Sequence, residues 1–195
     1  MANDQMFLGA TAKLTIASVD VRAPKDLVVK AQYNPKELQI TQPVGWREHE
    51  SLEGQLTTNI VMEFGGMKAS SMQVELLFDG AENQGKIGQR EGDPDVTDMI
   101  AMLKVLASVR DPYSSESKLR CPWQCLVTWG TGDPRSAEAH RGYMRPFRCV
   151  IESLTTKYLM FARDGRVLRA SCTVGLKEAE VVEVARPKNR VRGAA

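Results

Sequence analysis

Two long runs of alternating residues in the last third of the chain constrain its fold more than any other feature. Residues 146–162 and 166–179 each repeat with a period of two, which indicates strands. Asp164-Gly165 separates them, and an Asp-Gly turn between two alternating runs predicts a β-hairpin. We expect its second strand to present an apolar face of Leu168, Ala170, Cys172, Val174 and Leu176, and a small polar face of Val167, Arg169, Ser171, Thr173 and Gly175.

The same period recurs along most of the chain, so the fold is expected to be mainly β. Further strands are expected over 13–21, 27–33, 38–46, 57–64, 71–79 and 121–130. Gly65-Gly66 is expected to close the fourth of these runs. Asn34-Pro35 separates the second run from the third, because proline has no backbone N–H to donate to a central ladder. These patterns predict an antiparallel β-sandwich or barrel.

One segment, 93–109, has apolar residues at helical spacing and predicts a single amphipathic helix packed on a sheet. We expect Asp93 to be its N-cap and Pro94 to lie in its first turn, with Asp95 and Asp98 favouring the positive end of the helix dipole. The apolar stripe consists of Val96, Met99, Leu103, Leu106 and Ala107.

The chain shows no repeat or shift in composition, which predicts one domain over residues 1–185 and a basic tail over 186–195. The glycine-rich loop 80–92 is expected to be mobile in an isolated subunit, because it lacks an apolar face. The tail carries four basic residues and no acid, and either frays in solvent or docks on an acidic partner: Arg186, Lys188, Arg190 and Arg192.

The net charge of +2 argues against a general polyanion binder, so nucleic acid is not an expected partner. No apolar run approaches the ~20 residues that span a bilayer. The N-terminus lacks the basic and apolar regions of a secretory signal, so we expect folding in the cytoplasm and no insertion into a membrane.

No catalytic, cofactor or metal site is expected. If Cys121 and Cys125 share a strand, they lie ~13 Å apart, which is too far for one zinc ion or a disulfide. Cys149 and Cys172 fall inside strand-like runs and are expected to be buried thiols. The two histidines, His49 and His140, lie in polar surroundings without a neighbouring nucleophile, and the chain has no phosphate-binding or dinucleotide-binding motif.

The order of several short motifs resembles one family, the tube-type domain of contractile injection systems. The motifs are Tyr33-Asn34-Pro35, Leu77-Phe78-Asp79, Trp129-Gly130, and a hairpin with Phe161, Asp164-Gly165 and Arg169-Ala170. Together they cover roughly residues 10 to 180. The chain looks most like the first domain of the baseplate adaptor of such particles, which is similar to phage tail-tube initiators.

The resemblance implies a structural assembly protein rather than an enzyme. It implies a β fold of tail-tube type and a hexameric ring that joins the inner tube to the hub, spike and baseplate. Within it, Asn34, Pro35, Phe78, Asp79, Trp129, Gly130, Asp164 and Gly165 would be structural positions. The particle would assemble in the cytoplasm and could be released from the cell. Such adaptors often carry a LysM module after this domain, and here "RPKNRVRGAA" stands in that place. We therefore expect either a tube-initiator layer without the module or a basic tail that takes over the docking.

A second interpretation of the same strands is a monomeric β-sandwich that binds a small ligand or a glycan. Ring formation would favour assembly. A stable monomer whose melting temperature rises with a ligand would favour the binding domain.

Overall fold

The structure is a computed structural model that describes residues 12–20, 23, 27–48, 62–88, 94–116, 120–130 and 144–179. Seven antiparallel strands form the main sheet in the order β2-β1-β7-β8-β9-β6-β3. Their bounds are β1 Lys13–Ser18, β2 Val28–Lys30, β3 Gln39–Thr41, β6 Ser71–Asp79, β7 Cys125–Gly130, β8 Phe147–Phe161 and β9 Val167–Glu178. A separate two-stranded sheet pairs β4 (Val44–Glu48) with β5 (Met62–Met67).

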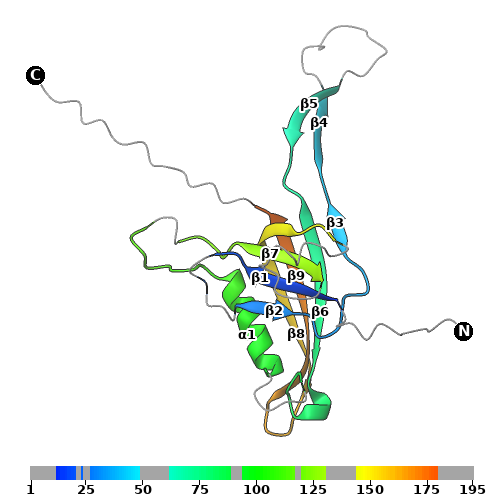
Figure 1. The fold of residues 1–195 in the computed structure, drawn as a ribbon, viewed down its shortest axis with the longest axis vertical. Helices are drawn as coiled ribbons and strands as arrows, with labels where there is room; N and C mark the ends of the chain where they lie inside the picture. The colour runs from blue at the N-terminus through cyan, green and yellow to red at the C-terminus, as the bar shows by residue number, and fades with distance from the viewer. Residues whose placement is uncertain are drawn as a thin grey trace, which may run out of the picture.

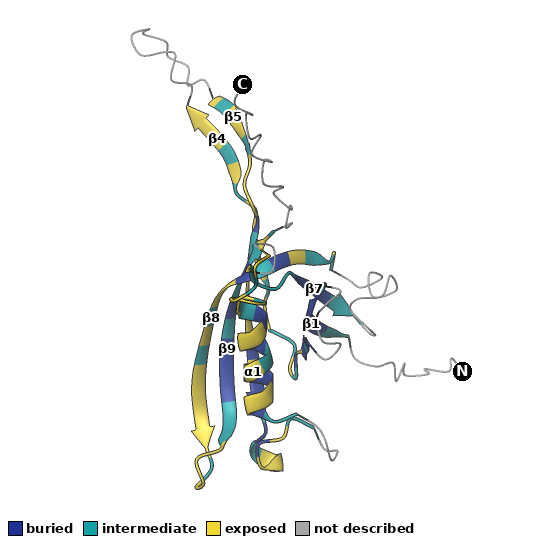
Figure 2. Cartoon of the chain, turned by 90° about the vertical axis from the view of Figure 1, so that its left-hand side faces the viewer, coloured by how far each residue is buried: buried dark blue, intermediate teal, exposed yellow. Residues whose placement is uncertain are grey.

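The main sheet curls on itself, and a short connection joins its two edge strands. Strand β2 is one edge and β3 the other, and only residues 31–38 connect them. Figure 1 shows β1, β2 and β7 in front of β6, β8 and β9, and Figure 2 shows the two layers edge-on. The expected mainly β, antiparallel architecture is therefore confirmed.

The core lies between the two layers and under one helix, α1 (Val96–Ala107). The inward residues of β6 are Met72, Val74, Leu76 and Phe78, all at most 2% exposed. The expected apolar face of β9 is confirmed from Ala170 to Leu176, and the helix buries Val96, Met99, Leu103 and Leu106 of its expected stripe, with Ile100 beside them.

The helix begins later than expected. Its N-cap is Asp95 rather than Asp93, and Pro94 lies before the helix instead of in its first turn. Asp98 explains this start, because its carboxylate accepts a hydrogen bond from the Asp95 amide at 2.9 Å and so satisfies a backbone donor at the helix start.

Two expected strands also end differently. The run 38–46 divides at Gln42-Pro43 into β3 and β4, which belong to different sheets, because Pro43 has no N–H for a continuous ladder. Gly65-Gly66 does not close a strand, since β5 continues to Met67. A Cβ on Gly45 would lie 2.5 Å from the Gly66 carbonyl oxygen, so glycine permits this close crossing.

The glycine-rich loop, which we expect to be mobile in the isolated subunit, has local structure in its described part, residues 80–88. Residues 81–83 form the short 3-10 helix η2 (Ala81–Asn83). The Gly80 amide donates to the Leu168 carbonyl at 2.8 Å, and the Val96 amide donates to the Gly85 carbonyl at 2.9 Å. Residues 80–88 are thus fastened to β9 and α1 by backbone hydrogen bonds, which the glycine content did not reveal. Residues 89–93 lie outside the described residues.

Candidate assembly surfaces

The Asn34-Pro35 corner ties the connection between the two sheet edges to β1. The Asn34 side chain donates to the Ala12 carbonyl at 2.8 Å and accepts from the Leu14 amide at 3.2 Å. It thereby makes the two hydrogen bonds that a neighbouring strand would otherwise make. This geometry supports a structural role for Asn34, with Pro35 fixing the backbone angle beside it.

Gln32, which the sequence did not single out, lies two residues before Asn34 and ties the same connection to the end of β6. Its side-chain amide donates to the Asp79 carbonyl at 2.8 Å and accepts from the Asp79 amide at 2.7 Å. Lys13 donates to the Gln32 carbonyl at 2.6 Å. A side chain that caps the end of a strand leaves no periodic signal, so only the structure reveals it.

Asp79 also holds an ion pair with Arg169, at 2.7 Å between carboxylate and guanidinium. The hydrogen bond from Arg169 lowers the pKa of Asp79, and the amide of Ala81 lowers it further while desolvation opposes both. The motif residues of β6 and β7 differ in their burial. Phe78 is fully buried, Trp129 packs partly against the core, and Gly130 is the last residue of β7.

The predicted Asp-Gly turn lies between β8 and β9. Gly165 has φ of +88°, a conformation that favours glycine. Asp164 pairs with Arg166 at 2.7 Å, and hydrogen bonds from the Arg166 amide and side chain lower the pKa of Asp164. The basic residues Arg186, Lys188, Arg190 and Arg192 lie outside the described residues, as do His49 and His140.

The outer face of β6, β9 and β8, called the wall face below, is mainly polar, with Leu77 as an exposed apolar residue. Thr173 lies between Glu75 of β6 and Thr155 of β8 in the sheet register. Ser171 donates to the Glu75 carboxylate at 2.5 Å, and Lys177 pairs with Glu152 at 3.6 Å. A groove of about 360 Å³ on this face is lined mainly by amide, hydroxyl and carboxylate side chains.

Strand β8 has a long unpaired edge. Strand β7 pairs only with its first three residues, Phe147–Cys149, whereas β9 pairs with β8 along almost its whole length. Among the described residues, no strand covers the other edge of residues 150–161. Unpaired edges are templates for pairing with another chain.

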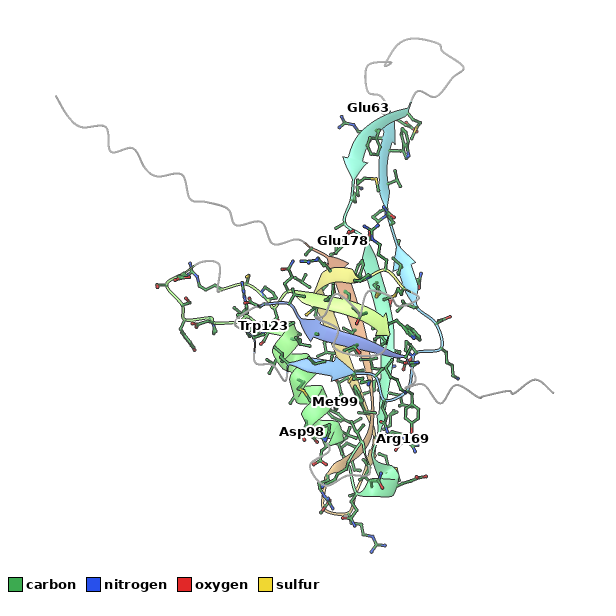
Figure 3. All side chains as sticks on the ribbon, in the orientation of Figure 1. Glu63, Asp98, Met99, Trp123, Arg169 and Glu178 are labelled. Atoms are coloured by element: carbon green, nitrogen blue, oxygen red, sulfur yellow. The ribbon has the colours of Figure 1, made fainter. Side chains whose placement is uncertain are left out.

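The arm, defined as β4 and β5, projects from the main sheet, with Glu63 near its outer end and Glu178 near its base (Figure 3). The Glu178 carboxylate accepts from the Ser70 amide at 3.0 Å at this base, and the Ser70 hydrogen bonds lower its pKa. One face of the arm bears Trp46 and Phe64, whose ring centroids lie 5.3 Å apart. The other face bears the ion pair of Arg47 and Glu63.

The tip, defined as residues 157–166, is the opposite end of the molecule (Figure 1). It exposes four consecutive large apolar residues of β8, from Tyr158 to Phe161. Register shifts lie on both sides of Met160 in the pairing with β9.

Cys125, Cys149 and Cys172 are buried thiols. The expected strand over 121–130 was too long, because β7 begins at Cys125, so Cys121 does not share a strand with Cys125. Cys125 and Cys149 are cross-strand neighbours. Burial raises the pKa of Cys125 to about 12 and raises that of Cys149 further, with a smaller contribution from Cys125. The part of the chain that the structure describes contains no cluster of three potential metal ligands.

A family model described as "contractile injection system tube protein" matches residues 10–185. The chain belongs to this family. The matched residues include the curled sheet, the arm and the tip. A comparison with curated proteins finds no significant match.

Family membership makes the chain a tube-related structural protein of a contractile injection system. In the part of the chain that the structure describes, no helix is both long and apolar enough to cross a membrane.

Proposed function

We propose that the chain is a tube initiator or adaptor: a ring of six copies that joins the inner tube to the hub, spike and baseplate. It carries no enzymatic activity and needs no cofactor in this role. The particle assembles in the cytoplasm and is then available for release. Residues 1–185 form the ring domain, and the basic tail docks on an acidic neighbour.

The observation that carries this proposal is the wall formed by β8, β9 and β6. One face of this sheet is packed in the core and the other is mainly polar, as a wall between protein and a water-filled channel requires. Its β8 edge is unpaired over residues 150–161. Pairing that edge with a neighbouring copy removes it and extends the sheet around a ring.

Hydrogen exchange tests the ring. In the assembled protein, the amides of residues 150–161 that face the unpaired edge should exchange more slowly than in the isolated subunit. Strand β9, which is paired on both sides, should change little and is the internal control. If rings form without added protection of residues 150–161, the proposed pairing of the β8 edge between neighbouring copies is wrong.

Binding to the other components of the particle tests the adaptor role. The chain should bind both the inner tube protein and the hub-spike protein, through different surfaces. Replacement of Arg186, Lys188, Arg190 and Arg192 by serine should weaken one of these contacts and leave the fold intact. Binding to the tube protein alone would make the chain an ordinary tube subunit.

The alternative, a monomeric ligand-binding domain, has one observation in its favour. An open groove of about 980 Å³ is lined by both apolar and charged side chains, among them Phe147, Arg148 and Glu178. A chain that stays monomeric at high concentration and whose melting temperature rises with a glycan or small ligand would support that alternative.

A further inference from the structure

The groove of about 980 Å³, called the base groove below, lies where the main sheet ends beside the base of the arm. Its described lining includes four large apolar side chains: Ile40, Leu126, Met144 and Phe147. Ile40 is 49% exposed, and Met144 and Phe147 are only partly buried, although they pack against the core. Covering apolar surface of this kind with another apolar surface is favourable.

The charges of the base groove are mainly positive. Its described lining has three charged side chains, Arg145, Arg148 and Glu178. Glu178 already has partners, because hydrogen bonds from Ser70 lower its pKa and Arg145 contributes less. Both arginines are exposed, and neither forms a salt bridge within the part of the chain that the structure describes. The base groove is therefore complementary to a segment that combines apolar side chains with carboxylates.

The chain itself leaves the main sheet at the base groove. Strand β9 ends at Glu178, and Ala179 continues its ladder for one more residue. The Ala179 amide donates to the Arg148 carbonyl at 3.4 Å, and the Ala179 carbonyl accepts from the Gln124 side chain at 3.1 Å. Because Gln124, Arg148 and Glu178 all line the base groove, the residue that follows Ala179 starts beside it.

The five residues that follow have the composition that the base groove favours. They are Glu180-Val181-Val182-Glu183-Val184, with three apolar side chains, two carboxylates and no base. Valine favours an extended backbone, and five extended residues span about 17 Å. Beyond the bond between Ala179 and Arg148, the next group on that edge belongs to Pro146, which offers a carbonyl but no N–H. Backbone pairing is therefore weakened there, and side-chain contacts must direct the segment.

We infer that residues 180–184 of the same chain dock in the base groove, with their valines on its apolar lining and their two carboxylates beside Arg145 and Arg148. The basic tail then starts at the base of the arm, on the side of Glu178 (Figure 3). The groove is filled by the chain and is not a site for a glycan or a small ligand. This docking goes beyond the proposed adaptor role and does not depend on it.

Photo-crosslinking of the full chain tests the docking directly. Benzoylphenylalanine replaces Val182, and the variant is mixed with an excess of isotopically labelled unmodified chain. Trypsin cleaves after Arg141 and Arg148 but not between Arg145 and Pro146, so one side of the base groove is recovered as the peptide 142–148. We expect products that join position 182 to the unlabelled form of this peptide, because the contact lies within one chain.

Benzoylphenylalanine at Ala194, near the end of the tail, is the matched control and should give few such products. The inference would be overturned by an equal yield from the two positions, or by products that join position 182 only to other segments. It would also be overturned by the absence of any product. Products with the labelled peptide alone would show that the segment docks on another copy.

Amide exchange provides a second measurement of the same contact. The double variant Arg145→Glu, Arg148→Glu should accelerate exchange in residues 180–184 about two- to tenfold, as expected for the loss of exposed ion pairs. Adding Glu180→Arg and Glu183→Arg to this variant should restore part of the protection, because the two charges are then exchanged across the contact.

The double variant Lys157→Glu, Arg163→Glu is the control for the charge variants. It reverses the same number of exposed positive charges at the tip, at the other end of the molecule. Circular dichroism establishes that each variant is folded. Equal acceleration by this control, or no acceleration by the double variant of Arg145 and Arg148, would contradict the docking.

The docked segment and the proposed role of the basic tail are separable by experiment. Replacement of the four basic tail residues by serine leaves residues 180–184 intact and should leave the crosslink from position 182 unchanged. A chain that forms this crosslink but binds neither the tube nor the hub-spike protein would refute the adaptor role and retain the docked segment.

The opposite result, binding of both partners without the crosslink, would retain the adaptor and refute the docking.

Discussion

At the scale of single residues, two side chains take the place of a missing strand. Between β2 and β3 the backbone leaves the sheet, and Gln32 and Asn34 supply the hydrogen bonds that backbone groups of Asp79, Ala12 and Leu14 would otherwise lack. Backbone groups left without partners away from water are costly. At this corner, the two side chains therefore supply the hydrogen bonds that a continuing strand would have supplied.

Asn34→Ala should lower the free energy of unfolding by about 1–2 kcal/mol, since it removes two hydrogen bonds and leaves the Leu14 amide without its acceptor. Pro35→Ala is the control, and should cost only about 0.5–1 kcal/mol through the added freedom of the unfolded chain. Urea unfolding measures both. If Pro35→Ala costs more than Asn34→Ala, the side-chain hydrogen bonds are not what holds the corner.

The Asp79–Arg169 pair should make stability depend on pH in the acid range. Its hydrogen bond lowers the folded-state pKa of Asp79 below the ordinary 3.8. The pair therefore contributes fully above pH 3.8, and its contribution is lost as the pH falls through the folded-state pKa. Urea unfolding at neutral pH and near pH 3 should show a smaller loss on acidification in Asp79→Asn than in the unmodified chain. Equal losses in both proteins would show that this pair is not linked to folding.

At the scale of elements, one face of β9 is packed in the core and the other lies on the outer surface. Val174 is fully buried in the core, while Thr173 lies on the wall face directly opposite Glu75. Substitutions at these adjacent positions therefore separate core packing from the chemistry of the outer surface.

Val174→Asp should unfold the subunit, because it buries an unpaired charge. Thr173→Asp should leave it folded with a small loss of stability, since a second carboxylate then faces Glu75. Thr173→Lys should cost less than Thr173→Asp, because its charge is opposite to that of Glu75. Circular dichroism and thermal melting compare the three variants. Unfolding by either Thr173 variant, with Val174→Asp folded, would reverse the assignment of the two faces.

Gly45→Ala should distort the arm without weakening the main sheet. The added Cβ would lie 2.5 Å from the Gly66 carbonyl oxygen, so β4 and β5 must separate. Amide exchange in residues 62–67 should accelerate, whereas the melting temperature of the subunit should change little. A large fall in melting temperature would show that the arm and the core unfold together.

At the scale of the whole molecule, the sequence predicted the buried faces of the main sheet well and the exposed arm poorly. The alternation in 71–79 and 166–179 indicated the buried faces of β6 and β9, because buried apolar and exposed polar side chains alternate along a half-buried strand. The arm was missed because Trp46 and Phe64 alternate as core residues do and yet are exposed. Periodicity reports which residues share a face, and it cannot say whether that face is covered by the same chain.

The break at Pro43 has a consequence for how such a protein can diverge. The arm leaves the sheet there, and none of its residues belongs to the buried core. Mutations on its apolar face are therefore largely released from the requirement that the subunit remain folded, and selection acts on them mainly through the surface that they meet. If arms are exchanged between related chains, the binding specificity should follow the arm, while the fold of the curled sheet stays the same.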